Sequence, residues 1–250
     1  MRPHVPDRLL LTVFAFAAGL SYAQTSVPYV GCPGDGQTGP YTAAKGSPKP
    51  VNLPPAVAGQ LAWYEYKGDV GQFGTLGPRG WNCYIAIGSD GLFLYVAPEP
   101  LNSAKILEHR SWNGFQGPVI QLSAPEGGTS GRFEVAQVVA RVFPAHHDYA
   151  RKIIAEGFGP ASNYRFGPFP TDRLEYKSKE LVEFTTPAHH KGLGTMSLLL
   201  PSDKPITGFA LLSIGRDIDT ELLQLNVRLP DSLSKLSAVF IQQAEMDGSK

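Results

Sequence analysis

The sequence lacks an excess of either charge, a long apolar run after residue 20 and the common catalytic motifs. Lys and Arg number 22, as do Asp and Glu, so no broad basic surface for nucleic acid is indicated. It also lacks an HExxH pair, a phosphate-binding loop and a dinucleotide fingerprint. Ser89 in IGSDG and Ser130 in GGTSG do not fit the spacing of a nucleophilic serine motif. Nucleic acid is therefore not an expected partner, and no strong catalytic constellation is evident.

The N-terminus has the three parts of a secretory signal peptide. Arg2 and Arg8 give the first residues a positive charge, and residues 9–20 form a twelve-residue apolar run. Ser21-Tyr22-Ala23 then supplies small residues at the cleavage positions. The run is shorter than the roughly 20 apolar residues of a membrane-spanning helix. We expect residues 1–23 to be a signal peptide cleaved near Ala23, leaving a soluble periplasmic or extracellular protein without an integral membrane segment. The alternative is that the segment stays uncleaved as an anchor.

The mature chain has few cysteines and many turn-forming residues. Cys32 and Cys83 are its two cysteines, and in an oxidising compartment an even pair predicts a disulfide. A catalytic role for the Cys83 thiol is the alternative. Gly and Pro together make up about a fifth of the chain, 27 and 22 of 250 residues, yet apolar runs persist throughout, which is typical of a loop-rich globular protein.

The first half reads as a β-rich part stapled by the disulfide. Residues 24–58 show little periodicity, and Gln24 to about Val30 reads as an untethered arm. One or two helical turns are expected from Pro55. Residues 81–87 and 92–97 read as two strands joined by an Asp-Gly turn, which is a strong hairpin signal. Their nearly continuous apolar residues indicate burial on both faces. The glycine-rich segments 74–80 and 192–195 read as turns.

The second half alternates helical and strand patterns. Residues 133–156 have helical spacing interrupted by Pro144, which predicts two helices. Strands are expected at 118–122, 180–186, 195–200, 207–214 and 222–228, and an amphipathic helix at 231–245. We predict an α+β protein with a mainly antiparallel sheet. The parts 24–125 and 126–250 form two units or one continuous domain, with the Gly-rich loop 124–131 as the expected boundary.

Two histidine pairs are the candidate metal ligands. His146-His147 and His189-His190 each end a PAHH string, and neutral imidazoles bind zinc or copper. Neighbouring side chains diverge, so one member of each pair at most would face a shared metal. Surface histidines are the alternative.

Alternating carboxylates are a second candidate. Asp217, Asp219 and Glu221 would share one face of an extended segment and could bind calcium, although the spacing departs from the EF-hand loop. A solvated strand edge is the alternative. No cofactor is predicted, with zinc or calcium as the two metals that these patterns would fit.

Aromatic residues near loops are the candidate binding residues. Arg79 and Trp81 lie in GPRGWNCY, and Tyr164 and Phe166 in the long loop 157–173. Exposed rings could stack on sugars or peptides, with Arg79 binding an anion. The alternative is that Trp81 packs on the disulfide as part of the core.

Several segments of the chain form a recognisable set, GCPGDGQTGP (31–40), LGPRGWNCY (76–84), GSDG (88–91), FEVAQVVARVFPA (133–145), GLGT (192–195) and VRLPDSL (227–233). Together they resemble a family of exported bacterial hypothetical proteins of unknown function. The family has a similar APRGWxC segment, and this chain departs from it at Gly77, where Ala is more frequent. The resemblance implies a bacterial, exported setting and supplies no activity.

The sequence thus favours an exported, non-enzymatic binding or envelope-associated module. The alternative is a secreted hydrolase or metal-dependent enzyme that uses the histidine pairs. The ligand and the partners cannot be read from these patterns.

Overall fold

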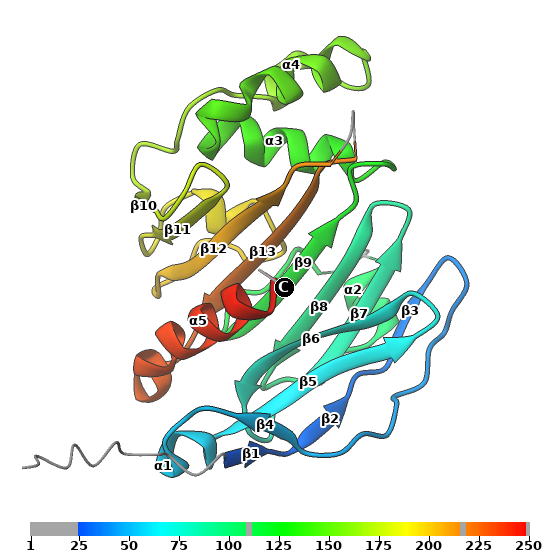
Figure 1. The fold of residues 1–250 in the computed structure, drawn as a ribbon, viewed down its shortest axis with the longest axis vertical. Helices are drawn as coiled ribbons and strands as arrows, with labels where there is room; N and C mark the ends of the chain where they lie inside the picture. Colours follow the sequence, from blue (N-terminus) through cyan, green and yellow to red (C-terminus); the bar gives the residue numbers. More distant parts are fainter. Residues whose placement is uncertain (1–24, 109–111, 216–218, 249–250) are drawn as a thin grey trace, which may run out of the picture.

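A computed structural model describes residues 25–108, 112–215 and 219–248. The expected signal peptide, residues 1–23, lies outside the described residues. The largest sheet has eight strands. It forms the middle layer of the molecule (Figure 1). Its strand order is β10-β11-β12-β13-β9-β8-β7-β3, and every pair is antiparallel except β3 and β7. The strands are β3 (Gly34–Gly36), β7 (Asn82–Gly88), β8 (Gly91–Ala97), β9 (Val119–Pro125), β10 (Arg173–Tyr176), β11 (Leu181–Thr186), β12 (Ile206–Ser213) and β13 (Glu221–Arg228).

This sheet takes strands from both sides of residue 125. β9 pairs with β8 on one side and with β13 on the other, so residues 24–125 and 126–250 contribute to the same sheet. The hairpin predicted at 81–97 is confirmed as β7 and β8, and the predicted α+β class is confirmed. The strand expected at 195–200 is wrong: residues Leu193–Thr195 form a 3-10 turn, and only an isolated bridge joins Leu199 to Phe115.

A smaller sheet lies over one face of the large one. It consists of the hairpin β5 (Leu61–Gly68) and β6 (Gly71–Pro78), with β2 (Tyr29–Gly31) parallel to β5. β1 (Thr25–Val27) pairs separately with β4 (Lys49–Val51). Two predictions are therefore corrected. The segment from Thr25 is tied down by strand pairing, and the glycine-rich stretch before Arg79 forms a strand.

On the other face of the large sheet, α3 (Arg132–Val142) packs against β9 and β13, and α4 (His147–Ala155) packs on α3 (Figure 1). α3 ends just before Pro144, which has no N–H to continue the helix. A 3-10 turn (Pro144–His146) leads into α4, so the predicted break is confirmed. The remaining helices are α1 (Pro55–Ala58), α2 (Ser103–Ile106) and α5 (Ser237–Gly248), with 3-10 turns at Ala161–Asn163 and Asp231–Leu236.

Strand alternation gives the large sheet a buried core on each face. On β8, Tyr95 faces the helices, whereas Leu94 and Val96 face the small sheet and α5. Burial on both faces, expected from the nearly continuous apolar strands, is confirmed. The predicted disulfide is also confirmed: Cys32 and Cys83, 51 residues apart, join the N-terminal segment to β7.

The GLGT segment forms a turn that Asp172 holds in place. The Asp172 carboxylate accepts hydrogen bonds from the Thr186 hydroxyl at 2.8 Å and from the Leu193 N–H at 2.7 Å. A Cβ at Gly194 would lie 2.6 Å from the Ile206 Cγ2 atom, so this position needs glycine. The turn is thereby packed against the end of β11 and the start of β12.

Candidate functional site

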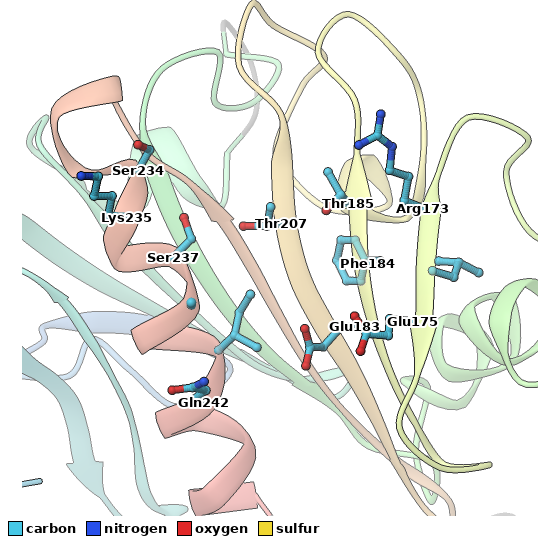
Figure 2. A pocket seen from close by; sticks show the side chains of 13 residues that line it. Arg173, Glu175, Glu183, Phe184, Thr185, Thr207, Ser234, Lys235, Ser237 and Gln242 are labelled. Carbon is cyan, nitrogen blue, oxygen red and sulfur yellow. The ribbon is translucent and has the colours of Figure 1, made fainter. Parts of the chain in front are cut away.

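A groove of about 630 Å³ lies between α5 and the outer strands β10, β11 and β12 (Figure 2). It arises because the small sheet and α5, which cover this face of the large sheet, do not reach over its outer strands. α5 packs against β6, β12 and β13 through its buried side chains Phe240, Ile241 and Ala244. β10 and β11 extend past the helix at the sheet edge (Figure 1), so their groove-facing side chains have a helix beside them and no layer on top.

The sheet wall of the groove carries two rows of side chains. Strand register places Arg173 opposite Thr185, and Thr185 opposite Thr207, which makes one row across β10, β11 and β12. Glu175 is opposite Glu183 in the second row. The rows are two residues apart along each strand, or about 7 Å at roughly 3.3 Å per residue. A cation and hydroxyls thus stand at one end of this wall and carboxylates at the other.

The helical wall carries its cation at the same end and a neutral amide at the other. Lys235 belongs to the 3-10 turn that precedes α5, and Gln242 lies in the middle of the helix. Lys204, just before β12, binds Asp231 at 2.7 Å, which fixes the start of this wall beside the start of β12, near Thr207. Figure 2 shows Ser234 and Lys235 toward the end of the groove that holds Arg173, and Gln242 toward the end that holds Glu183.

The acidic end is partly neutralised. Lys177 binds Glu175 at 2.6 Å and Glu183 at 2.9 Å, and these bonds raise the pKa of its ammonium group. Glu245 of α5 lies near enough that its pKa is raised, first by burial and then by the charge of Glu183. One lysine therefore serves the two carboxylates Glu175 and Glu183, so these three side chains together keep a net negative charge.

The basic end holds groups without a partner. Within the described ranges, Arg173 and Lys235 form no ion pair and no side-chain hydrogen bond, and both side chains are exposed. The Thr207 hydroxyl between them is buried and has no hydrogen-bond partner. An anionic group placed beside Thr207 would meet this unused hydroxyl with Arg173 in the same row of strand residues, whereas Figure 2 shows the Lys235 ammonium group directed away from the strands.

The aromatic candidates from the sequence lie on two different faces. Arg79 is exposed after β6, and Trp81 is half-buried against the core that contains the disulfide. Tyr164 is buried in the core under the helices, whereas Phe166 is 45% exposed and packs against the His147 ring and Arg151. The four residues therefore do not form one groove.

The histidine pairs stand at the two ends of β11. His146 Nε2 lies 3.2 Å from Glu180 Oε1, just before the strand, whereas the exposed His189 and His190 follow it. The six residues of β11 span about 20 Å. In the part of the chain that the structure describes, no three or more His, Cys, Asp or Glu residues are grouped to hold a metal.

The other sequence candidates are placed as follows. Asp217 lies outside the described residues, and Glu221 begins β13 after Asp219. Ser89 and Ser130 come together, with their hydroxyl oxygens 3.1 Å apart on the surface.

Sequence reasoning missed the groove, although one signal was present. Polar residues recur at every second position in β10 and β11, at Arg173 and Glu175 and again at Glu183 and Thr185. Such alternation is typical of a strand with one face open to water. The helical wall gives no comparable signal, because Ser234, Lys235, Ser237 and Gln242 read as the solvent face of an amphipathic helix.

No protein-family model, curated protein or solved structure matches the chain. Among the residues that the structure describes, no helix is both long and apolar enough to cross a membrane.

Proposed function

We propose that this protein is a binding module that holds a small zwitterionic ligand, of the kind represented by a short peptide with free termini, in the groove between α5 and β10–β12. One observation carries the proposal: both walls place cations or hydroxyls at one end and carboxylates or an amide at the other. A ligand with its anionic group near Arg173 and Thr207, and its ammonium group near Glu175 and Glu183, matches this order.

The dimensions agree with a ligand of this size. An extended chain spans at most about 3.3–3.6 Å per residue, so a dipeptide covers the roughly 7 Å between the two rows. The volume of about 630 Å³ falls in the usual range of small-molecule sites, about 300–1,000 Å³. Thr185 and Thr207 stand in the basic row, where a carboxylate can accept their hydrogen bonds.

The proposed setting is outside the cytoplasm, as a non-enzymatic binding or envelope-associated module. The signal-peptide pattern of residues 1–23 supports export, and the Cys32–Cys83 disulfide fits an oxidising compartment. The alternative, a hydrolase or metal enzyme that uses both histidine pairs, has no comparable geometric support because β11 separates the pairs.

Melting temperature measured with three matched probes tests the proposed function. The probes are dialanine, N-acetyl-dialanine and dialanine amide, the last two lacking one terminal charge each. We expect dialanine to stabilise the protein, since a ligand at one hundred times its dissociation constant adds about 2.7 kcal/mol. Both capped forms should bind about tenfold more weakly, because each loses hydrogen bonds to charged groups. No shift with dialanine at millimolar concentration, or equal shifts with all three probes, would contradict the proposal.

A further inference from the structure

A second cavity, of about 270 Å³, lies on the helix-covered face of the large sheet, away from the groove. Strands β7 and β8 with the turn between them, β9, the first turn of α3 and the end of α2 form its walls. The volume equals that of about nine water molecules at roughly 30 Å³ each, enough for a small organic molecule.

The charged side chains that line this cavity are both carboxylates. Glu134 projects from the first turn of α3, and Asp90 from the β7–β8 turn. Burial, followed by the charge of Asp90, raises the pKa of Glu134 to about 7. No lysine or arginine of the described chain is among the lining residues. A ligand cation would supply the missing countercharge.

Tyr95 points to a ligand independently of the carboxylates. Its side chain is 3% exposed and lines the cavity, and its hydroxyl makes no hydrogen bond within the described ranges. Burial and the neighbouring charges of Glu134 and Asp90 raise its pKa, which keeps the hydroxyl neutral. The ring stacks on Phe115 at a centroid distance of 5.7 Å, so the hydroxyl is held in a fixed place. A hydroxyl on a side chain this deeply placed normally has a hydrogen-bond partner, which a molecule in the cavity would supply.

The remaining walls are largely apolar. Phe93, Ile106 and Leu107 line the cavity together with Leu198. An aromatic ring attracts a nearby cation, and alkyl groups suit aliphatic walls. Carboxylates, an unused hydroxyl and rings around a space much larger than a single ion match an organic ammonium group better than a bare metal ion. Calcium prefers six to eight oxygen ligands.

We propose that the cavity bounded by Asp90, Glu134 and Tyr95 binds a small organic monocation, an alkylamine in its ammonium form. The ammonium group sits between the two carboxylates and donates to the Tyr95 hydroxyl. Its alkyl chain lies against Phe93, Ile106 and Leu107. This site is independent of the groove, since it lies on the opposite face of the large sheet.

Calorimetric titration with butylammonium chloride, and with 1-butanol as the neutral analogue of the same shape, tests this site. We expect the wild-type protein to bind butylammonium and not butanol. Glu134→Gln should weaken binding about tenfold or more, the usual loss when a hydrogen bond to a charged group is removed. Tyr95→Phe should weaken it as well. Glu126→Gln, an exposed carboxylate change at the loop before α3, should leave the affinity within about twofold of wild type.

Three results would overturn the proposal. They are no heat with butylammonium, equal binding of butanol, and equal butylammonium affinity in the Glu134→Gln and Glu126→Gln variants. Calcium chloride serves as a further titrant. Binding of calcium that depends on Glu134, without binding of butylammonium, would replace the organic cation by a metal ion. Melting curves of each variant without titrant confirm that the fold is retained.

Discussion

Arg228 shows how one buried charge can organise several loops. Its guanidinium, 1% exposed, donates to the backbone carbonyls of Gly117 at 2.9 Å, Leu200 at 2.5 Å and Phe115 at 2.5 Å. Burial lowers its pKa to about 10. A planar group with five donors suits this arrangement of acceptors, which a lysine could not reproduce. The side chain therefore links β13 to two loops that are distant in sequence.

We expect Arg228→Met to lower the free energy of unfolding by about 3 kcal/mol, because the change removes three hydrogen bonds from a charged donor to backbone carbonyls. Urea unfolding at neutral pH measures the loss. Arg79→Met, at an exposed position after β6, is the matched control and should change stability by less than about 0.5 kcal/mol. Equal stabilities of the two variants would show that Arg228 does not hold the loops.

Glu134 should make stability depend on pH. Its folded pKa of about 7 lies above the unfolded value near 4.5, so the folded state holds a proton that the unfolded state loses first. The stabilisation that the Glu134 proton gives the folded state is complete below about pH 4.5 and is lost as the pH rises to about 7. The titratable groups near Glu134 are Asp90, whose charge raises the Glu134 pKa, and Tyr95, whose hydroxyl stays neutral.

Glu134→Gln removes this titration. We expect the free energy of unfolding of the variant, relative to that of wild type, to rise by on the order of 1–2 kcal/mol from pH 4.5 to pH 8. This magnitude allows for partial solvent screening of the carboxyl. Urea unfolding of both proteins at the two pH values gives the difference, and shared contributions from other carboxyls cancel. The same difference between variant and wild type at both pH values would mean that the pKa of Glu134 is not raised.

At the scale of elements, the disulfide fastens the N-terminal segment to the large sheet. Cys32 follows β2, and Cys83 lies in β7. The Cys32 N–H also donates to the Glu65 carbonyl of β5 at 2.9 Å, so one short stretch contacts both sheets. The bond thus joins the two layers at the point where the chain passes between them.

We expect the double change Cys32→Ala, Cys83→Ala to lower the free energy of unfolding by about 2–4 kcal/mol. The loop of 51 residues becomes free in the unfolded state, and the chain-entropy estimate for it is about 4 kcal/mol. Denaturant unfolding measures the loss, with the oxidised wild-type protein as reference. A loss below about 1 kcal/mol would indicate that strand pairing alone holds the segment.

The elements that the sequence predicted are those with strong local signals. Asp90-Gly91 with apolar flanks predicts the β7–β8 hairpin, and Pro144 predicts the break between α3 and α4. The strand β6 was missed because its glycines resemble a turn. A Cβ at Gly74 would lie 2.8 Å from the Tyr64 carbonyl oxygen, and one at Gly77 would lie 2.9 Å from the Tyr64 ring. These glycines permit close packing against β5, a tertiary reason that no local pattern reveals.

The groove could not be predicted for the same physical reason. Its two walls are about 60 residues apart in sequence, from Arg173 to Lys235, and they meet only because α5 folds back over β12 and β13. The charges of each wall read separately as ordinary surface residues. Their polarity becomes visible when strand register and helix position are combined.

At the scale of the whole molecule, the large sheet separates two candidate sites of different character. The small sheet and α5 leave the outer strands open on one face, where the groove has a basic and an acidic end. The helices on the other face enclose an acidic and aromatic cavity. Because a buried core lies on each side of the sheet, the two sites can be altered one at a time without removing shared core residues.

The most direct test of the groove is a titration of dialanine and of dialanine amide into wild type and the Arg173→Gln, Lys235→Gln double variant. We expect the double variant to bind dialanine about tenfold or more weakly, because the carboxylate of the peptide loses the positive charges at the basic end of the groove. Its affinity for the amide should match that of wild type. Lys67→Gln, an exposed lysine change on β5, should alter neither affinity. An equal loss for both peptides, or no loss for either, would contradict a carboxylate site at the basic end of the groove.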